Sequence, residues 1–139
     1  MSTEKESPTM TTTDRPAPWV YEHGEQFDIP TTITQAEGIE DLSWHNDACP
    51  SFGRYIEGPT GDSHDLRIWC EHPDPDQRET GCARFFVGYQ PWSNEPVPEL
   101  EPFTDGAPIY EGDDPSEALA TFMVTLAKVH AWVRGGASA

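Results

Sequence analysis

The chain has 139 residues, and its 25 acidic and 8 basic side chains give a formal net charge of −17 at pH 7. This length fits one domain, and no apolar run approaches the roughly 18 residues of a membrane-spanning helix. A chain this acidic is not expected to bind nucleic acid or anionic lipid through a basic surface.

The N-terminal segment is rich in Ser, Thr and Pro, and Met is its only apolar residue type before Ala17. Such a composition cannot bury enough apolar surface to offset the entropy of ordering. We therefore predict a disordered tail over residues 1–18, followed by one domain over residues 19–136. The tail also lacks the apolar core of a signal peptide, which favours a cytoplasmic location.

The sequence after the tail predicts a series of short strands and turns. The polarity of WVYEH alternates weakly, and Pro30 restricts the segment around it to an edge strand or an extended arm, because proline cannot donate to a ladder. The turn residues of NDACP (46–50) separate two further strands. The expected strands are residues 19–23, 26–33, 41–46 and 51–58, followed by a loop over residues 59–65.

Two runs carry the clearest strand pattern, DLRIWCEH (65–72) and ARFFVGYQ (83–90). Apolar side chains recur at every second position in both runs, which is typical of strands. The polar linker between them predicts an antiparallel hairpin with a long tip loop. In this hairpin Trp69 and Phe86 share one face. The other face carries Leu66, Ile68, Cys70, Ala83, Phe85, Val87 and Tyr89.

The C-terminal third begins with five prolines over residues 91–108, which predict a long irregular surface loop. A short strand is expected over residues 107–112. Asp114, Pro115 and Glu117 then fit the N-cap, N1 and N3 positions of a helix over residues 114–134. Its apolar residues have helical spacing: Leu119, Phe122, Met123, Leu126, Val129 and Val133. The expected fold class is α+β, an antiparallel sheet of four to six strands covered on one face by the C-terminal helix.

The most distinctive stretch runs from Trp44 to Gln90 and contains WHNDACPSFGRYIEG, DLRIWCEHPDPDQRE and ARFFVGYQ. It resembles small uncharacterised proteins of actinobacteria and their phages, in which a similar NDACPSF turn precedes a strand and an HPDP loop. The resemblance covers about a third of the chain. It implies an accessory protein, and it carries over no catalytic residue.

Motifs of known enzymes are missing from the sequence. It has no Gly-x-Ser-x-Gly elbow, no Gly-rich phosphate loop and no His-Glu-x-x-His pair. We therefore expect a protein without enzymatic activity and without a cofactor.

The negative charge is spread evenly, with −6 over residues 1–40, −5 over residues 41–90 and −6 over residues 91–139. A folded body with such a field attracts basic partners. We therefore expect a binding protein that engages a basic protein surface, for example that of a nucleic-acid-binding protein. A general acidic surface that serves only solubility is the alternative.

Nucleic-acid mimicry, as in phage-borne inhibitors, is one form of this hypothesis. Alternate residues of a strand lie about 6.6 Å apart, which approaches the spacing of successive phosphates. Trp92 is added to the candidate contacts because Trp is enriched at interface hot spots. The candidate acidic residues are Glu37, Glu40, Asp41, Asp74, Asp76, Glu79, Glu95, Glu99 and Glu101.

Two further functions remain open. A small zinc-stabilised module would use Cys49, Cys70, His72 and Cys82, although their spacing differs from the usual paired Cys-x2-Cys knuckles. Buried thiols in a reducing compartment, or a Cys70–Cys82 disulfide, would explain the same cysteines without a metal. A homo-oligomeric scaffold would associate through the acid-poor face of the C-terminal helix, which carries Thr121, Thr125, Lys128 and Trp132.

Overall fold

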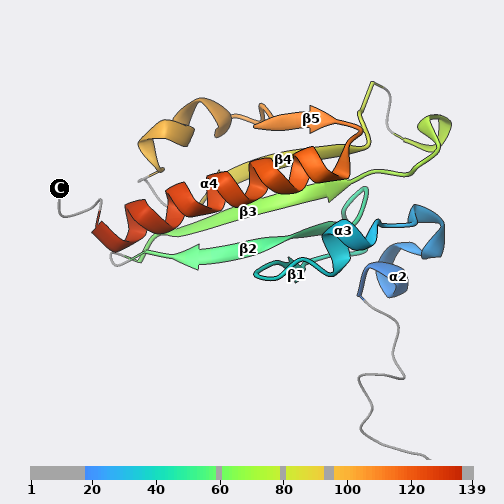
Figure 1. Cartoon of the computed structure of the whole chain (residues 1–139), viewed down its shortest axis with the longest axis horizontal. Helices are drawn as coiled ribbons and strands as arrows, with labels where there is room; N and C mark the ends of the chain where they lie inside the picture. The colour runs from blue at the N-terminus through green and yellow to red at the C-terminus, as the bar shows by residue number, and fades with distance from the viewer. Residues whose placement is uncertain (1–17, 59–60, 79–80, 93–95, 136–139) are drawn as a thin grey trace, which may run out of the picture.

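A five-stranded antiparallel sheet, crossed on one face by a long helix, forms the centre of the protein (Figure 1). In the computed structural model the described residues are 18–58, 61–78, 81–92 and 96–135. The strands are β1 (Glu40–Asp41), β2 (Ser51–Glu57), β3 (Ser63–Cys70), β4 (Phe85–Pro91) and β5 (Tyr110–Gly112). They lie in chain order, each antiparallel to the next. The predicted α+β class is confirmed.

The predicted hairpin is the pair β3 and β4, with Leu66 opposite Tyr89 and Ile68 opposite Val87. The predicted apolar face is buried: Leu66, Ile68, Cys70, Phe85 and Val87 are all 0% exposed. On the other face the rings of Trp69 and Phe86 stack with their centroids 6.2 Å apart. Both faces of the hairpin therefore agree with the period-two pattern.

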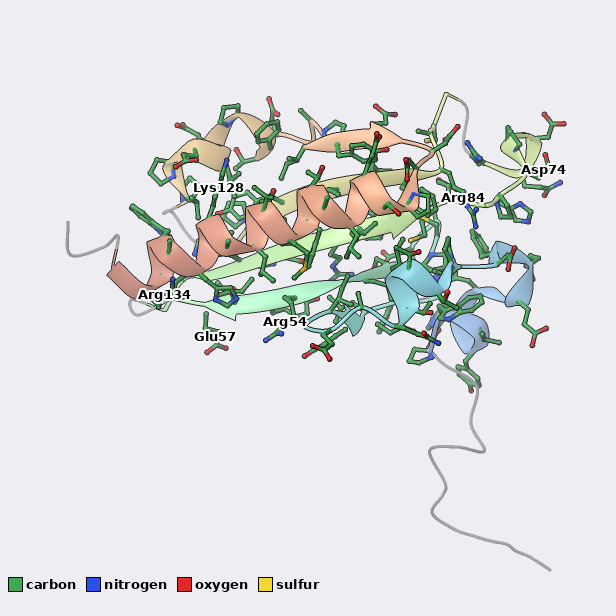
Figure 2. All side chains as sticks on the ribbon, viewed as in Figure 1. Arg54, Glu57, Asp74, Arg84, Lys128 and Arg134 are labelled. Carbon is green, nitrogen blue, oxygen red and sulfur yellow. The ribbon has the colours of Figure 1, made fainter. Side chains whose placement is uncertain are left out.

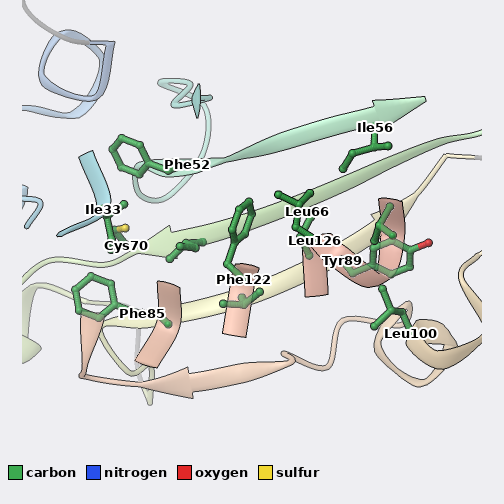
Figure 3. Packing of buried hydrophobic residues seen from close by; sticks show 14 of the residues in the cluster. Ile33, Phe52, Ile56, Leu66, Cys70, Phe85, Tyr89, Leu100, Phe122 and Leu126 are labelled. Carbon is green, nitrogen blue, oxygen red and sulfur yellow. The ribbon is translucent and has the colours of Figure 1, made fainter. Parts of the chain in front are cut away.

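Helix α4 (Pro115–Gly135) lies along the sheet and covers β3 and β4. Oδ1 of Asp114 accepts a hydrogen bond from the backbone N of Ser116 at 2.9 Å, so the predicted N-cap is confirmed. Phe122 and Leu126 pack into the core against the sheet (Figure 3). Met123 was expected in this apolar stripe, but it is 41% exposed because it lies on the outer side of the helix. No helix among the described residues has the length and apolarity to cross a bilayer.

The segment before the sheet is helical, so the two strands expected over residues 19–23 and 26–33 are wrong. It contains α2 (Pro18–His23), the 3-10 helix η1 (Glu25–Phe27) and α3 (Thr31–Thr34). Pro30 is the N-cap of α3, and Ile33 of α3 is fully buried in the core. Of the predicted disordered tail, residues 1–17 lie outside the described part, and Pro18 begins α2.

Other boundaries also differ from the prediction. The strand expected over residues 41–46 is reduced to β1, and β3 begins at Ser63 within the loop expected over residues 59–65. The long Pro-rich loop contains the 3-10 helix η3 (Pro98–Phe103), whose Leu100 is buried. A further 3-10 helix, η2 (Pro75–Gln77), lies in the tip loop of the hairpin. Of the last expected strand, residues 110–112 form β5.

Candidate binding surface

The sheet face turned away from α4, called the outer face here, carries the residues that alternate with the core. Because side chains point to opposite faces in turn, the register places them as a grid over three strands. The grid consists of Ser51, Gly53, Tyr55 and Glu57 of β2, Ser63, Asp65, Arg67 and Trp69 of β3, and Phe86, Gly88 and Gln90 of β4. This face therefore combines aromatic, charged and glycine residues.

Arg67 occupies the centre of the outer face. Its Nε donates to Oδ1 of Asp65 at 2.8 Å, and its Nη1 donates to Oγ of Ser51 at 3.0 Å. Its guanidinium carbon lies 5.3 Å from the ring centroids of both Tyr55 and Trp69. Burial lowers the pKa of Arg67, but the hydrogen bond and charge of Asp65, together with the charges of Tyr55 and Asp47, outweigh this effect and raise the pKa above its usual value. Arg67 is therefore a fixed cation that holds two aromatic rings.

Four aromatic residues of the outer face form what we call the aromatic platform. Tyr55 and Trp69 lie beside Arg67, Phe86 stacks on Trp69, and Trp92 follows the end of β4. Tyr55 is 50% exposed and Trp92 is 61% exposed. Trp92 follows β4, and its backbone N donates to the carbonyl of Ser63 at 2.8 Å, so the strand alternation extends to it. Tyr, Trp and Arg are the residue types enriched at interface hot spots. The composition of the platform therefore matches that of a protein-binding surface.

A hollow of about 200 Å³ lies beside the platform, on the β4 side of Arg67. Its lining includes Asp65, Trp69, Phe86, Gly88 and Gln90, and also Phe103 and Pro108 from the chain between η3 and β5. A Cβ at Gly88 would meet Nε1 of Trp69 at 3.6 Å, so the glycine keeps the space open. Small-molecule pockets start at roughly 300 Å³. The hollow is below that size and fits one amino acid side chain.

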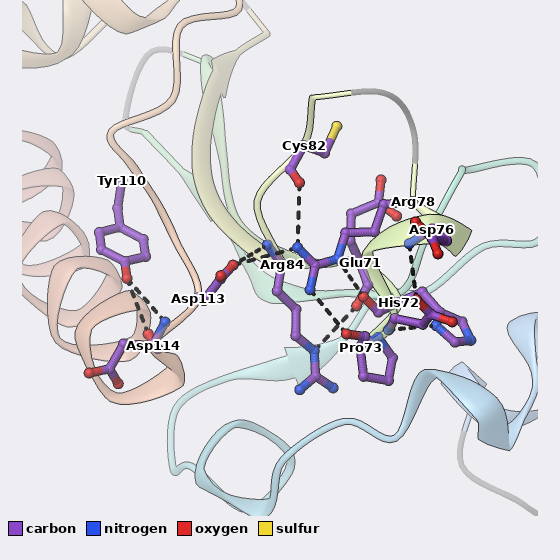
Figure 4. A network of polar contacts seen from close by, with 11 residues as sticks. Glu71, His72, Pro73, Asp76, Arg78, Cys82, Arg84, Tyr110, Asp113 and Asp114 are labelled. Atoms are coloured by element: carbon purple, nitrogen blue, oxygen red, sulfur yellow. Dashed lines mark hydrogen bonds and ion pairs between the residues drawn. The ribbon is translucent and has the colours of Figure 1, made fainter.

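Two of the basic side chains, Arg78 and Arg84, donate to oxygen atoms of the same chain (Figure 4). Nε of Arg78 donates to the His72 carbonyl at 2.6 Å, and Nη2 of Arg84 donates to the Asp28 carbonyl at 2.7 Å. Burial lowers the pKa of Arg84. Arg84 thus joins the hairpin to the N-terminal helical segment, and Arg78 holds the tip loop of the hairpin together.

Most of the acidic side chains, in contrast, face solvent. Among the 20 acidic residues of the described part, 14 are exposed. Lys128 and Arg54, two of the more exposed bases, pair with Glu99 at 3.3 Å and with Glu40 at 4.0 Å. Most of the basic side chains in the described part are paired or buried, whereas most of the acidic side chains are exposed. The surface of this part is therefore negative.

The acidic residues predicted as contacts lie in three separate places. Glu37, Glu40 and Asp41 lie at the edge strand β1, Asp74 and Asp76 lie in and beside η2, and Glu99 and Glu101 lie in η3. Glu79 and Glu95 lie outside the described residues. Figure 2 shows Asp74 and Lys128, the partner of Glu99, at opposite ends of the molecule. The described members of the set do not form the single stripe that mimicry of a nucleic-acid strand would need.

Several of these carboxylates stabilise local structure. Oδ2 of Asp41 accepts from the backbone N of Trp19 at 3.0 Å, and Oδ1 of Asp74 accepts from the backbone N of Asp76 at 3.0 Å. Glu99 forms an ion pair with Lys128. Three of the carboxylates predicted as partner contacts therefore bind groups of their own chain.

The zinc candidates are not gathered around one point. Within the described residues, no group of three or more His, Cys, Asp or Glu side chains could hold a metal ion. Cys49 and Cys70 are buried thiols, and burial raises the pKa of the Cys70 thiol well above its usual value. Nδ1 of His72 accepts from the backbone N of Asp74 at 3.0 Å. The Cys70–Cys82 disulfide considered above is wrong, because both residues are thiols.

A buried polar relay that the sequence analysis missed runs through Asp62, His64 and Tyr89. Nε2 of His64 lies 2.7 Å from Oδ2 of Asp62, and its Nδ1 lies 2.7 Å from the Tyr89 hydroxyl. The hydroxyl also accepts from the backbone N of Val97 at 2.9 Å. The three residues are at most 4% exposed, and burial raises the pKa of Tyr89. These hydrogen bonds join β3, β4 and the residue that caps η3.

Sequence reasoning found part of the outer face. Trp92 was among the predicted contacts, and the shared face of Trp69 and Phe86 followed from the strand pattern. Tyr55 and Arg67 were missed as contacts, although they occupy alternate positions of the predicted strands. The sequence does not predict a role for Gly88 in the site, since only the pairing of β3 with β4 shows that it lies beside Arg67.

Comparison with protein-family models, curated proteins and solved structures found no match to this chain. The resemblance noted over residues 44–90 therefore remains an expectation. Evidence for function comes from the outer face and from the distribution of charge.

Proposed function

We propose that the chain is a non-enzymatic binding module whose outer face receives a basic segment of a partner protein. The observation that carries this proposal is the aromatic platform, two of whose rings lie beside an arginine that already has its own carboxylate. Asp65 neutralises Arg67 at 2.8 Å, so the platform offers aromatic rings to a second cation without a local excess of positive charge. Lys and Arg side chains bind the faces of Trp, Tyr and Phe in this way.

The charge of the molecule supports the same class of partner. With a net charge of −17, the protein attracts basic surfaces from a distance and speeds their encounter. The carboxylates at β1, η2 and η3 would steer the partner, and the platform and the hollow would hold it. This division differs from nucleic-acid mimicry, in which the carboxylates themselves would form the contact.

The partner class that fits is a basic protein, for example a nucleic-acid-binding protein, and an inhibitory role in a phage or its host is compatible with it. We place the protein in the cytoplasm, a location supported by its odd number of cysteines, three, which does not suit a complete set of disulfides, because reducing compartments keep cysteines as thiols.

The experiment measures binding of a short arginine-rich peptide, and of its glutamate-rich counterpart, by fluorescence anisotropy. The arginine-rich peptide should bind, and its affinity should fall as salt rises from about 50 to about 500 mM, because salt screens exposed charges. Trp92→Ala should weaken binding at least about tenfold, as expected of a hot-spot residue.

Met123→Ala is the control, since Met123 is 41% exposed on α4, on the opposite side of the sheet from the platform. It should leave the affinity unchanged. Equal loss in the Trp92 and Met123 variants, or equal binding of both peptides, would contradict the proposal.

A further inference from the structure

The outward side of α4 is largely apolar, and its one acidic residue is Glu117 in the first turn. Val124 is 60% exposed and Met123 is 41% exposed, and exposed alanines lie on either side of them at positions 120, 127 and 131. No acidic residue follows Glu117 in the chain. In a protein of charge −17 this is an unusual surface, and α4 uses its opposite side to cover the sheet.

The residues along the centre of this side follow a heptad pattern. Glu117, Ala120, Val124, Ala127, Ala131 and Arg134 are separated alternately by three and four positions, which is the spacing of the a and d positions of a coiled coil. We call these six residues the α4 seam. The scaffold hypothesis named Thr125 and Trp132 instead, but Thr125 is buried and Trp132 packs against the core.

The α4 seam is complementary to itself in the antiparallel direction. Its six positions are symmetric about the point between residues 125 and 126. When a second α4 lies antiparallel about this point, Glu117 faces Arg134, Ala120 faces Ala131, and Val124 faces Ala127. Opposite charges thus meet at both ends, and a larger side chain meets a smaller one in the middle.

We propose that two copies of this chain associate through the α4 seam, as an antiparallel helix pair related by a twofold axis. Such an axis requires a patch that matches itself, and this requirement selects a second copy over an unrelated partner. The small side chains would allow the helix axes to approach to roughly 8 Å.

The flanks of the seam are compatible with this arrangement. Lys128 would lie opposite Thr121 of the other copy, so no two like charges would face each other. Lys128 is also held by Glu99 of its own chain at 3.3 Å. At physiological salt, with a Debye length of about 8 Å, the carboxylates far from the seam are largely screened.

The proposal is tested by sedimentation equilibrium of the full chain between about 10 μM and about 1 mM, a range that covers weak association. The average mass should rise from 15.5 kDa toward twice this value. Val124→Glu should raise the dissociation constant at least about tenfold, because it places a charge in an apolar layer. Gln77→Glu is the matched control: it adds the same charge on the exposed η2 and should change nothing.

Charge reversal gives a second, sharper test. Arg134→Glu should weaken association, and Arg134→Glu combined with Glu117→Arg should restore it, because the two ion pairs return with opposite orientation. Glu117 also accepts a hydrogen bond from the Tyr110 hydroxyl at 3.1 Å, so thermal unfolding of the double variant confirms that it is folded.

A monomer at the highest concentration would overturn the proposal. A dimer whose dissociation constant is unchanged by both Val124→Glu and Arg134→Glu would have its interface elsewhere. This result would also overturn the proposal. Neither result bears on the outer face, which lies on the other side of the sheet.

Discussion

Arg67 and Asp65 are two residues apart on β3, and their side chains form an ion pair of 2.8 Å on the outer face. Both are largely shielded, with 12% and 10% of the side chains exposed. The pair keeps Arg67 between the rings of Tyr55 and Trp69 and cancels its charge locally. The charge that a partner meets is therefore set by the carboxylates around the face.

Loss of this pair should destabilise the fold. Asp65→Asn leaves a shielded arginine without its counter-charge, and we expect the free energy of unfolding to fall by about 1–3 kcal/mol, the range for an unsatisfied buried group. Urea titration measures this change. Combined with Arg67→Met, the effect should be smaller than the sum of the two single variants, because both remove one interaction. Additive losses would show that the two side chains do not stabilise each other.

Two glycines of the outer face should respond differently to the same substitution. Gly88→Ala should leave the melting temperature nearly unchanged, since the new Cβ meets Trp69 at an ordinary contact distance of 3.6 Å. It should weaken binding of the arginine-rich peptide, because it reduces the hollow. Gly53→Ala should prevent stable folding, because its Cβ would run into the Leu66 carbonyl. Thermal unfolding and anisotropy separate these effects, and unchanged affinity of a folded Gly88→Ala variant would exclude the hollow from the binding site.

The buried relay should act on stability alone. His64→Ala leaves the Asp62 carboxylate and the Tyr89 hydroxyl without their common partner and opens a cavity. We expect a loss of about 2–4 kcal/mol in the free energy of unfolding. Tyr89→Phe keeps the ring and should lose less, about 1–2 kcal/mol, for the hydrogen bonds to His64 and Val97. An equal loss of unfolding free energy in Tyr89→Phe and His64→Ala would contradict this prediction.

Thiol chemistry distinguishes the buried cysteines from the partly exposed one. Cys49 and Cys70 are 2% and 0% exposed, whereas Cys82 is half-buried. A thiol reagent should therefore modify about one cysteine per native chain and the others only after denaturation, since reactivity requires access. Fast reaction of Cys70 in the native protein would contradict the fold of β3.

The Cys70 thiol should make the free energy of unfolding depend on pH in the alkaline range. Folding raises the pKa of Cys70 above its usual 9.0, so the folded state holds the proton where the unfolded state has lost it. Stability is then complete below about pH 9 and falls as pH rises further. The raised pKa of Tyr89 acts in the same direction above 10.0. Urea titrations at several pH values above 9 measure how fast the free energy of unfolding falls with pH. Cys70→Ala should make this fall less steep, and Cys82→Ala should leave it unchanged.

Sequence patterns predicted the elements whose signals are local and strong. The hairpin followed from the alternation around Ile68 and Val87, and α4 followed from the cap at Asp114. Both signals rest on spacing that the chain itself fixes. The N-terminal helices were missed because each is six residues or fewer, too short for a helical period to show. Their formation depends on distant contacts, such as the backbone N of Trp19 on Asp41.

The candidate site was only partly visible for a related reason. Counting charges predicted an acidic surface, but it could not show that the described candidate carboxylates lie at separate edges while Arg78 and Arg84 bind backbone carbonyls. The cluster of Tyr55, Arg67 and Trp69 depends on the register of β2 with β3. Register is a tertiary property, since a slip of one residue would turn these side chains to the other face.

The most direct test of the outer face as a binding site is an NMR titration of the five tryptophan indole N–H signals, assigned by single substitution, with the arginine-rich peptide. The signals of Trp69 and Trp92 should shift together and saturate at one affinity, and those of Trp19 and Trp132, which pack against the core, should stay in place. Shifts of Trp19 or Trp132 without movement of Trp69 and Trp92 would contradict the account.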